Sequence, residues 1–174
     1  MPVRVVVQGG PYRGVSREGV AALARAMLGA VQMADHELSI VLMNDNQIQE
    51  LNRVYRRKNR PTDVLAFSQR EGPYGAQAGT LLGDVVVSVP TARRQARARK
   101  ATLNEELTML VAHGLLHLLG WDHRTEATDR RMRSETERLC GIAADALRQA
   151  RLKDRIRRVT KRGKRTSSES RRGR

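Results

Sequence analysis

The histidine-rich segment HGLLHLLGWDH, from His113 to His123, constrains the fold of this 174-residue chain more than any other feature. His113 and His117 are four residues apart, so a helix would place both imidazoles on one face, one turn above the other. Gly120 allows the helix to stop in the left-handed conformation, after which the chain can turn back and present His123. The segment therefore requires an apolar helix that ends in a tight turn, with three imidazoles close together.

Three imidazoles with no fourth protein ligand are typical of a catalytic zinc site, which keeps one position open for water or substrate. We predict that His113, His117 and His123 bind one Zn²⁺, although imidazole ligands also suit nickel, copper or iron. A purely structural site is the alternative. Structural zinc is usually closed by four ligands including cysteine, and the single Cys140 lies a helix away. Asp122 could orient a histidine ring as an acceptor, or could serve only as a turn residue.

The ligand offsets match those of the metzincin zinc proteases, H-E-x-x-H-x-x-G-x-x-H. One position differs: Gly114 stands where those proteases carry the glutamate that acts as general base. The ligand set is kept and the base is missing, which argues against a metallopeptidase.

The net charge of +15 is unevenly distributed. The segment Arg148–Arg174, here called the basic tail, has 13 Lys or Arg and two acids, for a net charge of +11, which leaves +4 on the remaining 147 residues. Such a tail is typical of a polyanion-binding segment, most simply for RNA, although a solubilising extension is the alternative. We expect a domain over 1–147 and a basic extension over 148–174, helical at first and then disordered. No segment has the apolar length of a signal peptide or a membrane span, so the expected compartment is cytoplasmic, with no membrane partner.

The hydrophobic pattern predicts an α+β fold, with a small four-stranded mixed sheet packed against about five helices. The predicted strands cover 3–8, 37–43, 64–68 and 82–89, and the last is apolar enough to be central. Helices are expected over 16–34, 44–55 and 126–139. One more begins at Pro90, and another runs from the capping pair Thr102 and Glu105 to the histidines. A last helix runs from residue 143 into the basic tail. Residues 71–80 are expected to form a loop.

Three stretches together resemble the bacterial YbeY-type family of rRNA maturation endoribonucleases. The histidine segment is similar to the family pattern H-G-x-L-H-L-x-G-Y-D-H, and LNRVYRRKNRPTDVLAF (51–67) and LLGDVVVS (81–88) match upstream. The resemblance covers roughly residues 1–145. It implies a zinc-dependent endoribonuclease specific for single-stranded RNA, acting on the 3′ end of small-subunit rRNA and in ribosome quality control. It also implies RNA and the small ribosomal subunit as partners, with no DNA expected.

The resemblance assigns the family's functionally important arginine to Arg56, which would stabilise charge on the phosphoryl oxygens. From the residues alone, Arg56 could equally be a solvated charge in a basic run. Gly114 cannot be a base, and Asp122 is the one carboxylate of the motif that is a candidate. Either a water activated by the metal or the RNA's own 2′-hydroxyl would attack. Trp121, Arg57, Asn59 and Ala66 depart from the residues usual in the family, without touching the metal ligands. A non-catalytic rRNA-binding assembly factor with a structural metal is the main alternative function.

Only five residues are aromatic, too few for a base-stacking platform of the kind found in RNA-recognition motifs. We therefore expect RNA to be held mainly through its phosphates, with strong salt dependence and weak sequence preference.

Overall fold

The computed structural model describes residues 3–72 and 75–169 and confirms the predicted α+β fold. Four strands and five α-helices are present in these ranges, with one short 3₁₀ turn. The strands are β1 (Val3–Val7), β2 (Glu37–Met43), β3 (Val64–Ser68) and β4 (Leu81–Ser88). The helices are α1 (Arg17–Ala30), α2 (Asp45–Arg56), α3 (Val89–Ala98), α4 (Leu103–Leu118) and α5 (Glu126–Glu169), and the 3₁₀ turn η1 (Gly75–Gln77) lies in the predicted loop.

The sheet is mixed, with strand order β1-β2-β4-β3. β1, β2 and β4 are parallel, and β3 pairs antiparallel with β4 at the edge of the sheet. Ile40 of β2 and Ala66 of β3 lie on either side of Val85 in the register. β4 is therefore one of the two central strands, as its apolar sequence predicted. β3 has one edge without a strand partner among the described residues.

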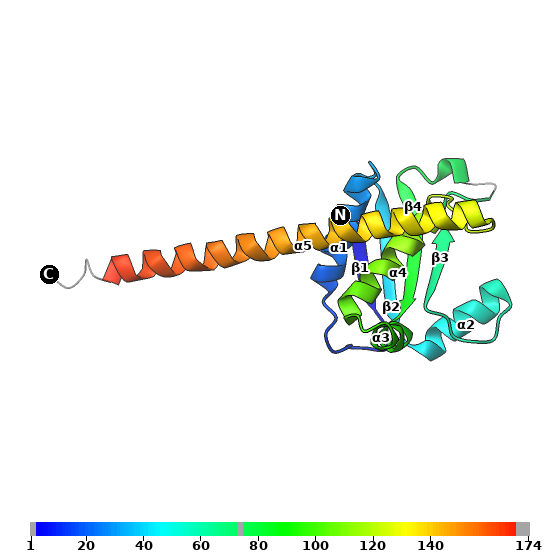
Figure 1. Ribbon diagram of the computed structural model, residues 1–174, viewed down its shortest axis with the longest axis horizontal. Coiled ribbons are helices and arrows are strands. Elements are labelled where there is room, and N and C mark those ends of the chain that lie inside the picture. The colour runs from blue at the N-terminus through cyan, green and yellow to red at the C-terminus, as the bar shows by residue number, and fades with distance from the viewer. Residues whose placement is uncertain (1–2, 73–74, 170–174) are drawn as a thin grey trace.

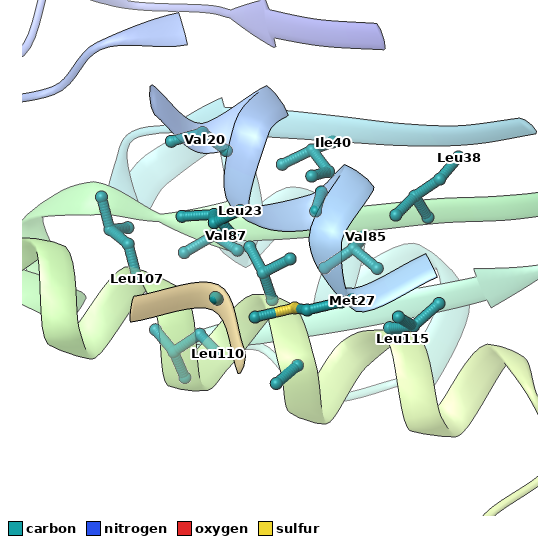
Figure 2. Close-up of a cluster of buried hydrophobic side chains, with 14 of the residues drawn as sticks. Val20, Leu23, Met27, Leu38, Ile40, Val85, Val87, Leu107, Leu110 and Leu115 are labelled. Atoms are coloured by element: carbon teal, nitrogen blue, oxygen red, sulfur yellow. The ribbon is translucent and has the colours of Figure 1, made fainter. Parts of the chain in front are cut away.

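One face of the sheet carries the main core. α1 and α4 pack on this face and α5 packs across both helices, as Figure 1 shows. Figure 2 shows side chains of α1, β2, β4 and α4 filling the space between these elements: Val20, Leu23, Met27, Leu38, Ile40, Val85, Val87, Leu107, Leu110 and Leu115. The opposite face has a smaller cluster under α2, formed by Met43, Ile48, Leu65 and Val86. Successive side chains along β3 and β4 point to opposite faces of the sheet, so each strand contributes residues to both clusters.

Helix boundaries follow their local signals. Ser16 caps α1, and complete capping boxes open α2 at Asn44 and Gln47 and α4 at Thr102 and Glu105. Pro90 lies in the first turn of α3, as expected from its fixed φ. Gly120 has φ 84°, which is the left-handed stop predicted after the histidine helix.

Two predicted helix boundaries were wrong. Residues 126–139 and the segment from 143 onward form one continuous helix, because Leu139 and Ala143 are both buried in the core, and this packing outweighs the weak helix propensity of Gly141. α1 ends at Ala30 rather than near Ala34, since Gln32 adopts a left-handed φ of 59°.

The C-terminal part of α5 extends well beyond the rest of the molecule (Figure 1). It contains residues 148–169 of the basic tail, and the last five residues of the tail lie outside the described part of the chain. The predicted disorder after the helix, and the division at residue 147, stay predictions. Within residues 3–72 and 75–169, no helix combines the length and the apolar character that crossing a membrane requires.

Candidate metal centre

The three histidines lie together at the C-terminal end of α4. His113 and His117 come from the last two turns of the helix, and His123 comes from the segment that follows Gly120. One ring nitrogen from each of the three lies within 4.8 Å of the others. The Nε2 atoms of His113 and His117 are 3.1 Å apart, and the ring centroids of His117 and His123 are separated by 5.2 Å. The structure thus brings together all three residues predicted to bind metal.

The orientation of His117 is fixed by a backbone group that the sequence did not reveal. The Nδ1 atom of His117 lies 3.1 Å from the carbonyl oxygen of Trp121. A carbonyl can only accept, so Nδ1 donates, and the lone pair of Nε2 is directed at the other two rings. Asp122, the alternative candidate for this role, accepts a hydrogen bond from the backbone N–H of Arg124 and so acts as a turn residue.

The surroundings of His113 and His117 favour their neutral forms. Burial lowers the pKa of His113 below its usual value, and the charges of His117 and His123 lower it further. The pKa of His117 is lowered by burial first, then by His123, against the raising effect of the Trp121 carbonyl. Metal binding requires the neutral form with a free lone pair. Three converging ring nitrogens, one with its tautomer fixed, fit an open zinc site.

Gly114 is required by packing, which explains why this position cannot hold the glutamate of the peptidase signature. It is buried where α4 crosses β4, and an added Cβ would lie 2.6 Å from Cγ1 of Val85 and 3.0 Å from its Cγ2. Val85 is fully buried, and the close packing of a protein interior opposes the shift that an added Cβ would require. The close approach of helix and strand therefore depends on the absence of a side chain at this position.

We expect Gly114→Ala to destabilise the fold by about 1–3 kcal/mol, because the overpacking exceeds the gain in helix propensity. The matched control is Gly141→Ala on α5, where an added Cβ meets nothing within 4 Å. That variant should be stabilised by about 0.5–1 kcal/mol. Urea unfolding of both variants measures the difference. Equal effects of the two substitutions would show that helix propensity, rather than the contact with Val85, decides the stability.

Arg56, the predicted catalytic residue, lines the same cleft as the three histidines. This cleft has a volume of about 670 Å³ and lies between the end of α4, β3 and the loop after α2. Nη2 of Arg56 donates to the carbonyl oxygen of Ala66 at 3.2 Å, and the side chain is otherwise exposed. Its positive charge also contributes to the lowered pKa of His117. The structure therefore places Arg56 near the histidines, although 57 residues separate it from His113 in the sequence.

Asn52 is a buried polar residue that sequence reasoning missed. Its side-chain amide donates to the backbone carbonyl oxygen of Arg60 at 2.8 Å. Its backbone carbonyl oxygen accepts a hydrogen bond from the backbone N–H of Lys58. Arg57 between them adopts a left-handed φ of 56°, a conformation that glycine takes without strain. Asn52 thus fixes the loop that presents Lys58 and Arg60 to the cleft.

Comparison with known proteins agrees with this geometry. The sequence profile described as Endoribonuclease YbeY matches residues 13–142, which include Arg56 and all three histidines. The chain belongs to the YbeY family. The family match ends before the basic tail begins.

Curated members of the YbeY family are similar over most of this region. The Endoribonuclease YbeY of Synechococcus sp. (strain JA-2-3B'a(2-13)) is 51% identical over 108 residues, which cover 59% of this chain and 66% of that protein. The protein of the same name from Anaeromyxobacter sp. (strain Fw109-5) is 48% identical over 129 residues, covering 72% and 66%. The chain therefore spans about two thirds of the length of these relatives. The Aquifex aeolicus (strain VF5) protein, also named Endoribonuclease YbeY, is 40% identical over 72% of this chain and 81% of its own length.

The solution structure of TM1509 from Thermotoga maritima has a similar fold. It aligns with a TM-score of 0.59 over 85% of this chain and 93% of that one, at 24% sequence identity. This likeness supports the α+β architecture on which the histidine cluster is built.

Proposed function

We propose that this protein is a zinc-dependent endoribonuclease that cleaves single-stranded RNA. The observation that carries the proposal is the placement of three converging imidazoles and Arg56 in one cleft. Membership of the YbeY family, whose curated members carry the name endoribonuclease, supports RNA as the substrate. When bound, zinc would polarise a phosphodiester oxygen or activate a water near neutral pH.

The protein's own residues would bind and orient the scissile phosphate. Arg56 would donate to the phosphoryl oxygens, because a guanidinium matches their geometry and stays protonated. Lys58 and Arg60 line the same cleft and would attract the neighbouring phosphates. The hydrogen bond from His117 to the Trp121 carbonyl would hold its ring in place throughout. Gly114 offers no base, and the carboxylates that line the cleft are Asp63, Glu71 and Asp122. The attacking group would be either a water or the 2′-hydroxyl of the RNA.

The alternatives differ in what they require. A peptidase would need its general base at position 114, and the contact with Val85 leaves no room for that side chain. A non-catalytic assembly factor would not use the metal for chemistry, so its zinc-loaded form would bind RNA without cutting it.

The first test measures metal content and RNA cleavage on one purified sample. We expect about one zinc per chain and cleavage of a single-stranded RNA, with the same sequence in a duplex left intact. Removal of the metal by a chelator should abolish cleavage, and added zinc should restore it. A product with a 2′,3′-cyclic phosphate would identify the 2′-hydroxyl as the attacking group. Bound zinc without cleavage, where a control nuclease is active, would favour the assembly factor.

The cellular role that we propose is maturation of the 3′ end of small-subunit rRNA in the cytoplasm, together with ribosome quality control. The support is the family resemblance of the three motifs and the strongly basic tail. Because phosphate contacts carry little sequence information, selection of one rRNA site would depend on the ribosomal particle.

The basic tail is proposed as an RNA anchor. A chain truncated after Ala150 loses 12 Lys or Arg and keeps the buried part of α5, which includes Met132, Leu139 and Ala143. We expect weaker RNA binding and a shallower dependence of log Kd on log salt concentration, with zinc content unchanged. Binding titrations between about 50 and 200 mM salt measure both. An unchanged affinity and salt slope would show that the tail is not the anchor.

A further inference from the structure

A second groove lies beside the histidine cleft, on the face of the sheet opposite α4. It has a volume of about 1070 Å³ and is lined by apolar side chains of β2, α2 and β4, among them Val41, Leu51 and Val86. α2 covers only part of this face, above the small cluster around Ile48 and Leu65. The groove is not used by the proposed catalytic residues, except for Arg56 at its boundary.

Two of the five aromatic residues meet in this groove. Tyr55 is the residue before Arg56 on α2, and Phe67 is on β3. Their ring centroids are 5.1 Å apart and their planes are inclined by 67°, an edge-to-face contact. Phe67 is half-buried against the small cluster, whereas Tyr55 is 64% exposed. The Tyr55 ring is therefore supported by a neighbour while most of its surface faces solvent.

The groove and the cleft adjoin at the edge of β3. Arg56, Ala66, Ser68 and Glu71 line both of them. Arg56 bridges the helix and the edge strand through its hydrogen bond to the Ala66 carbonyl. An extended chain that crosses this edge at Arg56 would pass from the histidines to Tyr55.

The cleft and the groove differ in charge, so they would bind different parts of a nucleotide. The cleft contains four Lys or Arg against three acids, in addition to the histidines. The groove contains one basic residue, the shared Arg56, against Glu50, Glu71 and Asp84. A phosphate is favoured in the cleft and disfavoured in the groove, while an uncharged base with a flat apolar face is accepted in the groove.

We propose that Tyr55, supported by Phe67, forms a stacking subsite for one nucleobase of the RNA strand whose phosphate lies at the histidines. The subsite rests on the proposed function. It adds a contact to a base to the contacts that the cleft makes with the phosphates. Stacking on an aromatic ring is tolerant of base identity, so the subsite favours unpaired nucleotides without reading sequence. A base held in a duplex cannot reach the Tyr55 ring, which gives a physical reason for the preference for single strands.

The test uses the full-length protein and short single-stranded RNAs that carry one abasic nucleotide at successive positions around the cut. With wild type, one position within about two nucleotides of the cut should weaken kcat/KM about tenfold, mainly through KM. Tyr55→Leu should lose the same factor on intact RNA and should be insensitive to the abasic nucleotide. Tyr55→Phe keeps the ring and should behave as wild type. Val54→Ala is the matched control, because Val54 is also exposed on α2 but does not line the groove.

A second readout separates the subsite from catalysis. An RNA with 2-aminopurine at the sensitive position should be quenched on binding to metal-free wild type, and not on binding to Tyr55→Leu. Quenching without any cleavage by the zinc-loaded protein would retain the subsite and refute the nuclease. Cleavage with the same KM in wild type and Tyr55→Leu would overturn the subsite and retain the nuclease. A defect of Tyr55→Leu seen only on ribosomal particles, and not on free RNA, would also overturn it and assign the groove to a protein.

Discussion

His117→Ala should purify with almost no zinc and should cleave single-stranded RNA roughly 10³-fold more slowly than wild type, because several kcal/mol of transition-state stabilisation are lost with the metal. His117 lies between the other two histidines of the cluster, with its ring centroid 4.7 Å from that of His113 and 5.2 Å from that of His123. Its Nε2 atom lies 3.1 Å from that of His113, and its other nitrogen is tied to the Trp121 carbonyl. Two remaining imidazoles, one of them on an exposed segment, make a much weaker site. Metal analysis and cleavage rates on the same sample measure both effects.

His36→Ala is the matched control for this prediction. His36 is the one histidine of the chain that lies outside the cluster. Its Nε2 atom lies 3.5 Å from Nη2 of Arg70. It should keep its zinc and its activity. The fold of His117→Ala should survive, because the buried residues of α4 that precede the site are unchanged. Full zinc occupancy in His117→Ala would contradict the ligand assignment. Zinc-free protein that folds and still supports ribosome maturation would favour an assembly factor.

The features that could be predicted from sequence are those set by residues close together in the chain. The pairing of His113 with His117 needs only the pitch of a helix, and the return of His123 needs only a left-handed Gly120. The capping box at Thr102 and the start of α3 at Pro90 are equally local. For the same reason, the sequence alone revealed that the peptidase base is absent at Gly114. It did not reveal the contact with Val85, which requires a glycine at this position.

What could not be predicted depends on contacts between distant segments. The strand order is one such feature, since β4 lies between β2 and β3, two strands that follow each other in the chain. The continuity of α5 through Gly141 depends on burial of Leu139 and Ala143 against the core. The pairing of Tyr55 with Phe67 requires α2 and β3 to meet on one face of the sheet. A count of aromatic residues therefore underestimated what the fold could assemble.

Arg56→Ala should reduce RNA cleavage by about 10²–10³-fold while the zinc content stays at about one per chain. Arg56 lines the histidine cleft, and the hydrogen bond from Nη2 to the Ala66 carbonyl positions the guanidinium, leaving its other N–H groups for the phosphoryl oxygens. Arg56→Lys retains the charge without the planar fork, so it should recover only part of the rate. Single-turnover cleavage with saturating enzyme separates this loss from weaker RNA binding.

Arg53→Ala provides the control for charge and for helix stability. Arg53 lies one turn earlier on α2, is paired with Glu50 through two hydrogen bonds, and lines neither the cleft nor the groove. An exposed pair of this kind contributes little to stability, so the variant should cleave as wild type does. The change in zinc affinity of Arg56→Ala distinguishes two roles of Arg56, contact with the phosphate and support of the metal site. A nearby positive charge disfavours a bound cation, so its removal should leave zinc affinity unchanged or slightly higher. Zinc loss in Arg56→Ala would mean that Arg56 supports the metal site, and unchanged cleavage would remove Arg56 from the mechanism.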